Sequence, residues 1–280
     1  MVVSYIKIDV GNYQRGKLKG KKPTSAQLCK HHDGNYYIHI QIKDEPPTPI
    51  QSDNVIGVDF GRRDIAVTSN GDQWDGQQIN RVRDKFSRVR ASLQKKASKG
   101  TRSTRRRTRQ ILKRLSGKEK RYQQWLNHNI SKQIIQNATE TSAAVAIEDL
   151  TGIRERTNQQ PRNKTERRRS NSWSFYQLRS FLEYKGIQAG VEVIAVPPAY
   201  TSLTCHCCLQ IGMRSDKRFK CTNDACSWSG DADANAAKNI AAIGAVFVNP
   251  PRGSNGLCCS LNVDSSGLLK AHTVTQVQRG

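Results

Sequence analysis

The chain has 280 residues, of which 36% are hydrophobic and 25% charged, and it carries 46 Lys and Arg against 23 Asp and Glu. The formal charge of +23 at pH 7 predicts a polyanionic partner such as nucleic acid. No apolar run approaches the length of a membrane span, which excludes a membrane-spanning protein, and this length suffices for one core with small appendages.

Residues 1–50 are expected to form β-structure. The stretch YYIHIQIKD alternates apolar with polar residues, and a Gly-Asn turn follows HHD, as in a hairpin. The segment ends in a Pro-containing linker, DEPPTPIQSDN. The first residues, MVVSYIKIDV, lack the basic start and apolar core of a signal peptide, so we expect a reducing, cytoplasmic setting.

The next segment predicts three strands. VIGVDF and IAVTS are β-branched runs separated by a Gly-containing connection, which is consistent with adjacent strands. SNGDQ supplies a turn toward a third strand. Asp59 lies at the end of the first run.

Most of the excess charge lies between Arg81 and Arg121, where eighteen Lys or Arg face two acids, a net +16. Apolar residues at near-helical spacing flank the polar stretch SKGTRSTRRRTR, which predicts two basic helices with a turn near Gly100. A solvated basic face is the alternative, but at this density like charges favour phosphate as counter-charge. The residues expected to bind nucleic acid are Lys95, Lys96, Arg102, Arg105, Arg106, Arg107, Arg109, Lys113 and Arg114.

Helices and strands alternate in the second half of the chain. YQQWLNHNISKQIIQNA predicts an amphipathic helix, AAVAIEDL a buried strand, WSFYQLRSFLEYKGIQAG a helix ending at glycines, and VEVIAVPP a strand stopped by two prolines. Residues 154–169, RERTNQQPRNKTERRR, predict a mobile basic loop that orders on nucleic acid. Together these patterns indicate an α/β domain with parallel pairing in part of its sheet.

Three carboxylates stand at strand ends or at a helix start, namely Asp59 in VIGVDFG, Glu148 in AAVAIEDL and Asp233 in GDADANAAKNI. Metal-dependent phosphodiester cleavage uses two divalent cations about 3.5 to 4 Å apart, and clustered carboxylates are the natural ligands of Mg²⁺. Each acid also has an ordinary interpretation. Asp59 could be a plain strand terminus, Glu148 with Asp149 a solvated strand end, and Asp233 a helix N-cap.

Four of the eight cysteines form the pattern Cys205-x2-Cys208-x12-Cys221-x4-Cys226, which is zinc-ribbon spacing with a wide second knuckle. In a reducing setting such cysteines are expected to hold structural Zn²⁺, and a redox or disulfide role is the alternative. Cys207 lies inside the first knuckle and could compete as a ligand, whereas the ligand set is full without His206. No role is assigned to Cys29, Cys258 or Cys259.

These pieces together resemble the OrfB/TnpB family of insertion-sequence transposons, which is related to the RNA-guided type V CRISPR effector nucleases. The resemblance runs from about Asn54 to Ile240 and rests on GVDFG, AIEDL, WSFYQLRSFLEYKG, VPPAYTSLTCHCC and DADANAAKNI. As a set these motifs are far more specific than any one of them.

The resemblance implies a RuvC-like nuclease of the RNase H fold in which Asp59, Glu148 and Asp233 are the catalytic, magnesium-binding acids. Asp59 would bridge both metals, and the other two would complete one site each. The third acid is Asp233 rather than Asp231, since it directly precedes x-N-A-A. The family's zinc ribbon falls where Cys205 to Cys226 stand, and Leu209 replaces the more usual Gly, a change expected to strain the knuckle.

The implied organisation has five parts. Residues 1–50 resemble the last strands of the family's guide-RNA-gripping wedge β-barrel, whose remainder and inserted helical lobe we expect to be absent. They are followed by a nuclease core at 54–200 with a basic helical insertion at 80–140, a zinc ribbon at 201–230, a final helix at 231–247 and a disordered tail at 248–280.

The function implied is that of a transposon-encoded DNA-binding protein of the transposase class, acting as a divalent-metal-dependent DNA endonuclease that is RNA-guided when complete. The alternative is a truncated, catalytically idle remnant, or an accessory protein, that binds nucleic acid without cutting it.

Overall fold

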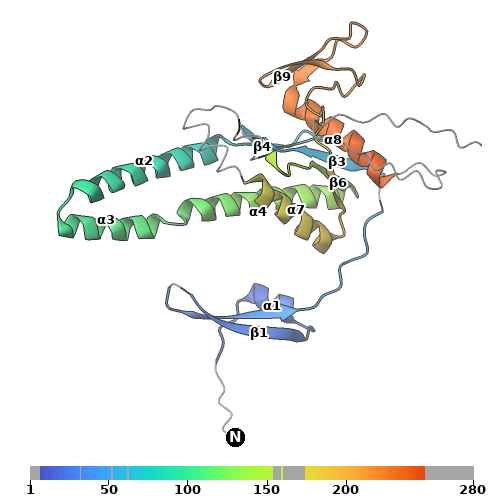
Figure 1. The fold of residues 1–280 in the computed structure, drawn as a ribbon. Coiled ribbons are helices and arrows are strands. Elements are labelled where there is room, and N and C mark those ends of the chain that lie inside the picture. Colours follow the sequence, from blue (N-terminus) through green and yellow to red (C-terminus); the bar gives the residue numbers. More distant parts are fainter. Residues whose placement is uncertain are drawn as a thin grey trace, which may run out of the picture. The chain divides into compact units, whose positions relative to one another are not determined.

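The computed structural model (Figure 1) describes residues 7–249 except 32, 52, 62, 154–158 and 160–173. The chain divides into two compact units, Met1–Pro47 and Thr48–Gly280. The first unit contains a short helix and a two-stranded sheet. The second contains a five-stranded sheet with its helices and a smaller three-stranded sheet.

The first unit confirms the predicted hairpin. Strands β1 (Pro23–Lys30) and β2 (Tyr36–Ile42) pair antiparallel, and Gly34 supplies the positive φ that the connecting turn needs. Helix α1 (Asn12–Leu18) was not predicted. Its seven residues bury nothing and have no side-chain cap, so the sequence carries no periodic signal for it.

The central sheet has the strand order β5-β4-β3-β6-β7. Its strands are β3 (Val55–Asp59), β4 (Asp64–Thr68), β5 (Gln73–Asp75), β6 (Ala144–Glu148) and β7 (Val193–Val196). Strands β3, β4 and β5 pair antiparallel, whereas β3, β6 and β7 run parallel. The predicted α/β class with partly parallel pairing is therefore confirmed, as are the three strands expected from VIGVDF to the turn at SNGDQ.

Both faces of this sheet are covered by helices. The helices are α2 (Gln77–Lys99), α3 (Arg102–Leu115), α4 (Lys118–Glu140), α7 (Phe175–Ala189) and α8 (Ala232–Val248). Along β6, Val145 and Ile147 pack in the core cluster with residues of α4 and α7, while Ala146 packs with Ile240 of α8. Because successive strand residues point to opposite faces, α8 covers one face and α4 with α7 the other.

Helix α8 packs directly on β3, the first strand of the central sheet in chain order. A Cβ added at Gly57 would collide with the backbone of Ala237 and Ala241, so only glycine permits this approach. At Gly244, on the helix side, an added Cβ would meet Ala146. The glycine in VIGVDF thus brings the start of α8 close to the end of β3, which positions the candidate site.

The two predicted basic helices are present as α2 and α3. Helix α2 ends at Lys99, followed by Gly100, and α3 begins after Thr101, whose hydroxyl oxygen accepts a hydrogen bond from the Thr104 amide. The two helices contact each other, and the only buried residue of α3 is Thr108. The cationic side chains of α3 therefore face solvent.

The cysteine-containing segment forms its own small sheet. Strands β8 (Gly212–Ser215), β9 (Arg218–Cys221) and β10 (Ser229–Asp231) pair antiparallel in the order β10-β9-β8. Its core is Cys205, Phe219, Cys221 and Ala232. Such a small core needs a cross-link or a metal to be stable.

Two expectations lie outside the described residues, namely the mobile loop at 154–158 and 160–169 and the tail beyond residue 249. Within the described part of the chain, no helix is both long and apolar enough to cross a membrane.

Candidate active site

The end of the central sheet brings two of the three acids together. Asp59 is the last residue of β3 and Glu148 the last of β6, and the register aligns Val58 with Ile147 immediately before them. Because the strands are parallel neighbours, both carboxylates emerge at the same edge of the sheet. Asp233 stands in the first turn of α8, which packs on β3 and β6.

The negative charges of Glu148 and Asp233 affect the pKa of Asp59. Burial raises the pKa of Asp59 to about 8, with further contributions from the negative charges of Glu148 and then Asp233. Without a cation, Asp59 therefore holds a proton at neutral pH. Burial also raises the pKa of Glu148, to which the Thr201 hydroxyl donates a hydrogen bond, and that of Asp233, where Arg214 opposes the effect.

The three acids lie close enough for their charges to interact. The negative charges of Glu148, Asp233 and also Asp231 raise the pKa of Asp59. Among the described residues, the group of three or more His, Cys, Asp or Glu side chains that is placed to hold a metal ion is a set of cysteines, whose ligand atoms all lie within 4.8 Å of one another.

Two of the ordinary interpretations of the acids are wrong. The N-cap of α8 is Asp231, not Asp233, because Asp231 Oδ1 accepts hydrogen bonds of 2.9 Å from the amides of Asp233 and Ala234. Glu148 is not a solvated strand end, since only 9% of it is exposed. Its neighbour Asp149 is half exposed and is paired with Arg179 at 2.7 Å.

Sequence reasoning missed the cations that reach the acids from the small sheet. Arg214 of β8 is paired with Asp233, with Nη2 to Oδ1 at 2.6 Å, and Lys217 is paired with the buried Asp64 at the start of β4. Arg63 and Asp216 form a further, exposed pair at 2.5 Å. No sequence signal could have found these pairs, because up to 153 residues separate their members.

Two asparagines of α8, at the i and i+4 positions, attach the cysteine segment to this helix. Asn235 Nδ2 donates to the Thr204 carbonyl at 2.7 Å, and its Oδ1 accepts from the His206 amide at 3.0 Å. Asn239 Nδ2 donates to the carbonyls of Thr201 and Thr204. The same segment therefore connects Glu148, through Thr201, to the cysteines. The NAAKN spacing was the available signal.

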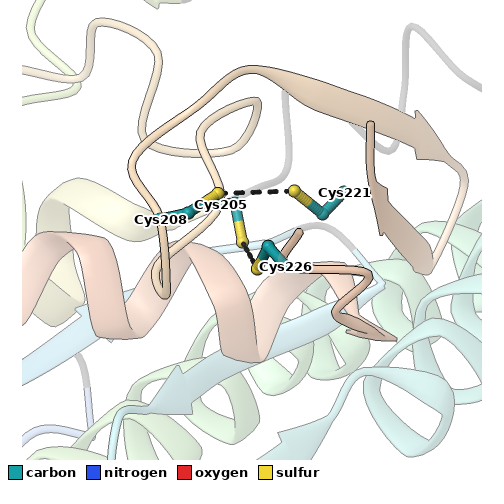
Figure 2. Close-up of side chains that lie close together, drawn as sticks. All are labelled: Cys205, Cys208, Cys221 and Cys226. Carbon is teal, nitrogen blue, oxygen red and sulfur yellow. Dashed lines mark hydrogen bonds between the residues drawn. The ribbon is translucent and has the colours of Figure 1, made fainter. Parts of the chain in front are cut away.

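The four predicted cysteines are brought together (Figure 2). Sγ of Cys205 lies 3.8 Å from that of Cys226, and Sγ of Cys208 lies 3.4 Å from that of Cys221. Tetrahedral zinc with Zn–S bonds of about 2.3 Å places its sulfurs roughly 3.8 Å apart, so these residues could hold zinc. All four are free thiols, and the Gln210 backbone amide lowers the pKa of Cys208 to about 7. The exposed Cys207 stands outside the group.

Leu209 has a φ of +62°, the left-handed conformation in which the sequence predicted strain. Its side chain is 69% exposed, so little packing would be lost with it. We expect Leu209→Gly to raise the free energy of unfolding of the protein by about 1 kcal/mol, measured by denaturant titration. Leu209→Ala removes the same packing but keeps the strain, so an equal gain from alanine would contradict the explanation.

This chain matches two family models and is similar in fold to a solved structure. The model of a family described as "Probable transposase" matches residues 37–154, and one described as "Cas12f1-like, TNB domain" matches residues 175–240. Asp59 and Glu148 fall in the first range, and Asp233 and the four cysteines fall in the second. The fold is similar to that in the solved Cas12f1–sgRNA–target DNA complex, with a TM-score of 0.52 and 20% identity over 77% of this chain and 55% of that one.

Curated relatives give the same result. The chain is 34% identical to the TnpB-like protein MJ0751 of Methanocaldococcus jannaschii, over 59% of this chain and 57% of that protein. It is 31% identical to the CRISPR-associated endodeoxyribonuclease Cas12f1 of Sulfoacidibacillus thermotolerans, over 80% of this chain and 54% of the relative. The matching family models and relatives are those that the motifs predicted, the OrfB/TnpB transposases and the related Cas12f1 nucleases, and the chain spans little more than half the length of these relatives.

Proposed function

We propose that the protein is a divalent-metal-dependent DNA endonuclease of the TnpB type, directed by a guide RNA, with Asp59, Glu148 and Asp233 as its metal-binding catalytic acids. The observation that carries the proposal is the convergence of three largely buried carboxylates from separate elements on one region. Their mutual repulsion is a cost that a bound cation would remove. The sheet order, an antiparallel β3-β4-β5 meander continued by parallel β6 and β7, is compatible with an RNase H-like, RuvC-like domain.

The three acids would have different tasks. Two Mg²⁺ ions at this edge would ready a water molecule for attack on phosphorus and stabilise the leaving oxygen. The charges of both other acids raise the pKa of Asp59, so its carboxylate is the one suited to be shared between two ions. Thr201 holds Glu148 in place, and the first turn of α8 holds Asp233.

We further propose that the cysteine group binds a structural zinc ion and that the segment is a zinc ribbon. The sulfur spacings and the free thiols support this assignment, as does the small apolar core around them. The ribbon would keep Arg214 and Lys217 beside the acids, because both lie on or next to its β8–β9 hairpin.

DNA and a guide RNA are the proposed partners. A solved structure of similar fold is a complex of Cas12f1 with an RNA and target DNA, and helices α2 and α3 present exposed cations. We expect these cations to bind phosphates without regard to base sequence. A non-cutting remnant is not favoured, because all three acids are present and the matched Cas12f1 relative is named as an endodeoxyribonuclease.

The contribution of α3 to binding is tested by salt dependence. Replacing Arg105, Arg106 and Arg107 by glutamine should weaken DNA binding and lower the slope of log K against log[salt] by about 1 for each phosphate that the variant no longer neutralises. Binding is measured by fluorescence anisotropy between about 50 and 300 mM salt, in EDTA. Lys220→Gln, on the exposed side of β9, is the control. An unchanged slope in the triple variant would contradict the assignment.

The function itself is tested by incubating purified protein with labelled single- and double-stranded DNA in Mg²⁺ or in EDTA. We expect cutting only in Mg²⁺, and a guide RNA is added in a parallel reaction. Absence of cutting in every reaction, by protein that is folded and binds DNA, would refute the proposed activity.

A further inference from the structure

The face formed by α4 and α7 carries aromatic rings that are not buried in the core. These helices pack together on the sheet face opposite α8 (Figure 1), and their outer side presents Trp125, His128, Phe181 and Tyr184, here named the α4–α7 aromatic face. Trp125 is 58% exposed and Tyr184 38%. Exposed large rings at adjoining positions are costly unless a ligand covers them.

The rings of this face form contacts across the two helices. His128 stacks on Phe181 with ring centroids 3.9 Å apart and planes 18° apart, and Tyr184 meets Phe181 edge-on at 5.8 Å. The Tyr184 hydroxyl lies 3.3 Å from His128 Nδ1. Trp125 stands one helical turn before His128 on the same side of α4. The arrangement therefore has three rings in mutual contact, with the exposed indole ring of Trp125 one helical turn away along α4.

Lys185 lies among these rings, and the positive charge of Lys132 acts on it. Lys185 Nζ donates to the His128 carbonyl at 2.6 Å and to Ser131 Oγ at 2.8 Å, and it lies 6.0 Å from the Phe181 and Tyr184 rings. Two of the three N–H donors of the Lys185 ammonium group are thus used. Burial and then the positive charge of Lys132 lower the pKa of Lys185, so an anion placed between the two lysines would be favourable.

Two acidic residues of these helices are paired with arginines. Glu183 of α7 is paired with Arg179 at 2.8 Å, and Glu119 of α4 is paired with Arg90. Burial and Lys185 lower the pKa of His128, so its ring is neutral at pH 7 and suited to stacking. The face thus combines uncharged aromatic rings with lysine cations.

We propose that the α4–α7 aromatic face binds single-stranded nucleic acid, with bases stacked on Trp125 and neighbouring rings and phosphates held by Lys132 and Lys185. Stacking with flanking cations is how sequence-tolerant single-strand sites work, whereas a purely apolar face would fit another protein. The inference rests on the proposed function and deepens it by adding a strand-holding surface separate from the acids and from the phosphate-binding α2–α3 pair. It leaves the choice between DNA and RNA to experiment.

The test measures binding of the full chain, in EDTA, to a DNA strand of about 15 nucleotides, to the RNA strand of the same sequence and to an abasic DNA strand of the same length. We expect Trp125→Ala to weaken binding of at least one base-containing strand about 5- to 100-fold and to leave abasic binding nearly unchanged. Trp125→Phe should restore most of the affinity. Phe247→Ala, which removes another half-exposed ring on α8, is the matched control.

Two results would overturn the inference. One is an equal affinity of wild type and Trp125→Ala for both base-containing strands. The other is loss of self-association in Trp125→Ala with unchanged binding of nucleic acid, which would make the face a protein interface. Because no cleavage is measured, the surface can be refuted while nuclease activity stands, and an inactive chain that shows the Trp125 effect would refute only the activity.

Discussion

Replacing Asp59 by asparagine should lower the rate of Mg²⁺-dependent DNA cleavage about 10³-fold or more, while binding of DNA in EDTA changes little. The carboxylate proposed to be shared by both ions is lost, and several kcal/mol of transition-state stabilisation depend on it. Asparagine keeps the shape of the side chain, so folding is preserved. Cleavage is measured under single-turnover conditions with excess protein.

The control for this variant is Asp53→Asn, which changes an exposed aspartate just before β3. It should cut at the rate of the wild type. Cutting by Asp59→Asn within a few-fold of the wild-type rate would refute the assignment of the site, because asparagine cannot supply the negative carboxylate that is proposed to be shared between the two ions.

The same variant has a second readout in the pH dependence of stability. The pKa of Asp59 is about 8 in the folded protein against an ordinary 3.8, so the folded state binds the proton more tightly than the unfolded state. In metal-free protein, stability from this group is present at low pH, declines once pH exceeds the ordinary value, and is lost as pH rises through about 8. Asp59→Asn should flatten the fall in Tm between about pH 5 and 9. An unchanged slope would mean that the group ionises normally.

Replacing Cys205 by serine should weaken zinc binding about 10²-fold or more and unfold the segment 201–231. Cys205 is fully buried and contributes both a proposed ligand and part of the small core. Zinc content is measured on the purified protein by elemental analysis, and stability by thermal denaturation with and without a chelator.

This substitution should also reduce cleavage, since Arg214 and the Thr201 hydroxyl are held near the acids by the same segment. Cys207→Ser, which changes the exposed cysteine of the same knuckle, should keep one zinc ion per chain and full stability. Loss of zinc from Cys207→Ser together with its retention in Cys205→Ser would refute the ligand set.

Much of the fold was predictable because its signals are local. Alternation and β-branched runs indicated strands, an amphipathic period indicated α4, glycines marked the end of α7, and Gly100 marked the turn between the basic helices. Helix α1 escaped prediction since it buries no face. The interpretation of Asp233 as the N-cap of α8 was wrong because Asp231 also stands where the helix begins, and only hydrogen-bond geometry separates them.

The sequence by itself determined most of the elements of the central sheet and its helices, the spacing of four cysteines and the placing of three acids at the ends of elements, since each of these depends on residues close together in the chain. Only the tertiary structure decided that β3 and β6 end side by side, that Arg214 and Lys217 reach Asp233 and Asp64, and that aromatic rings of α4 and α7 adjoin. The physical reason is that these contacts join distant segments through packing on a shared sheet, which no local pattern records.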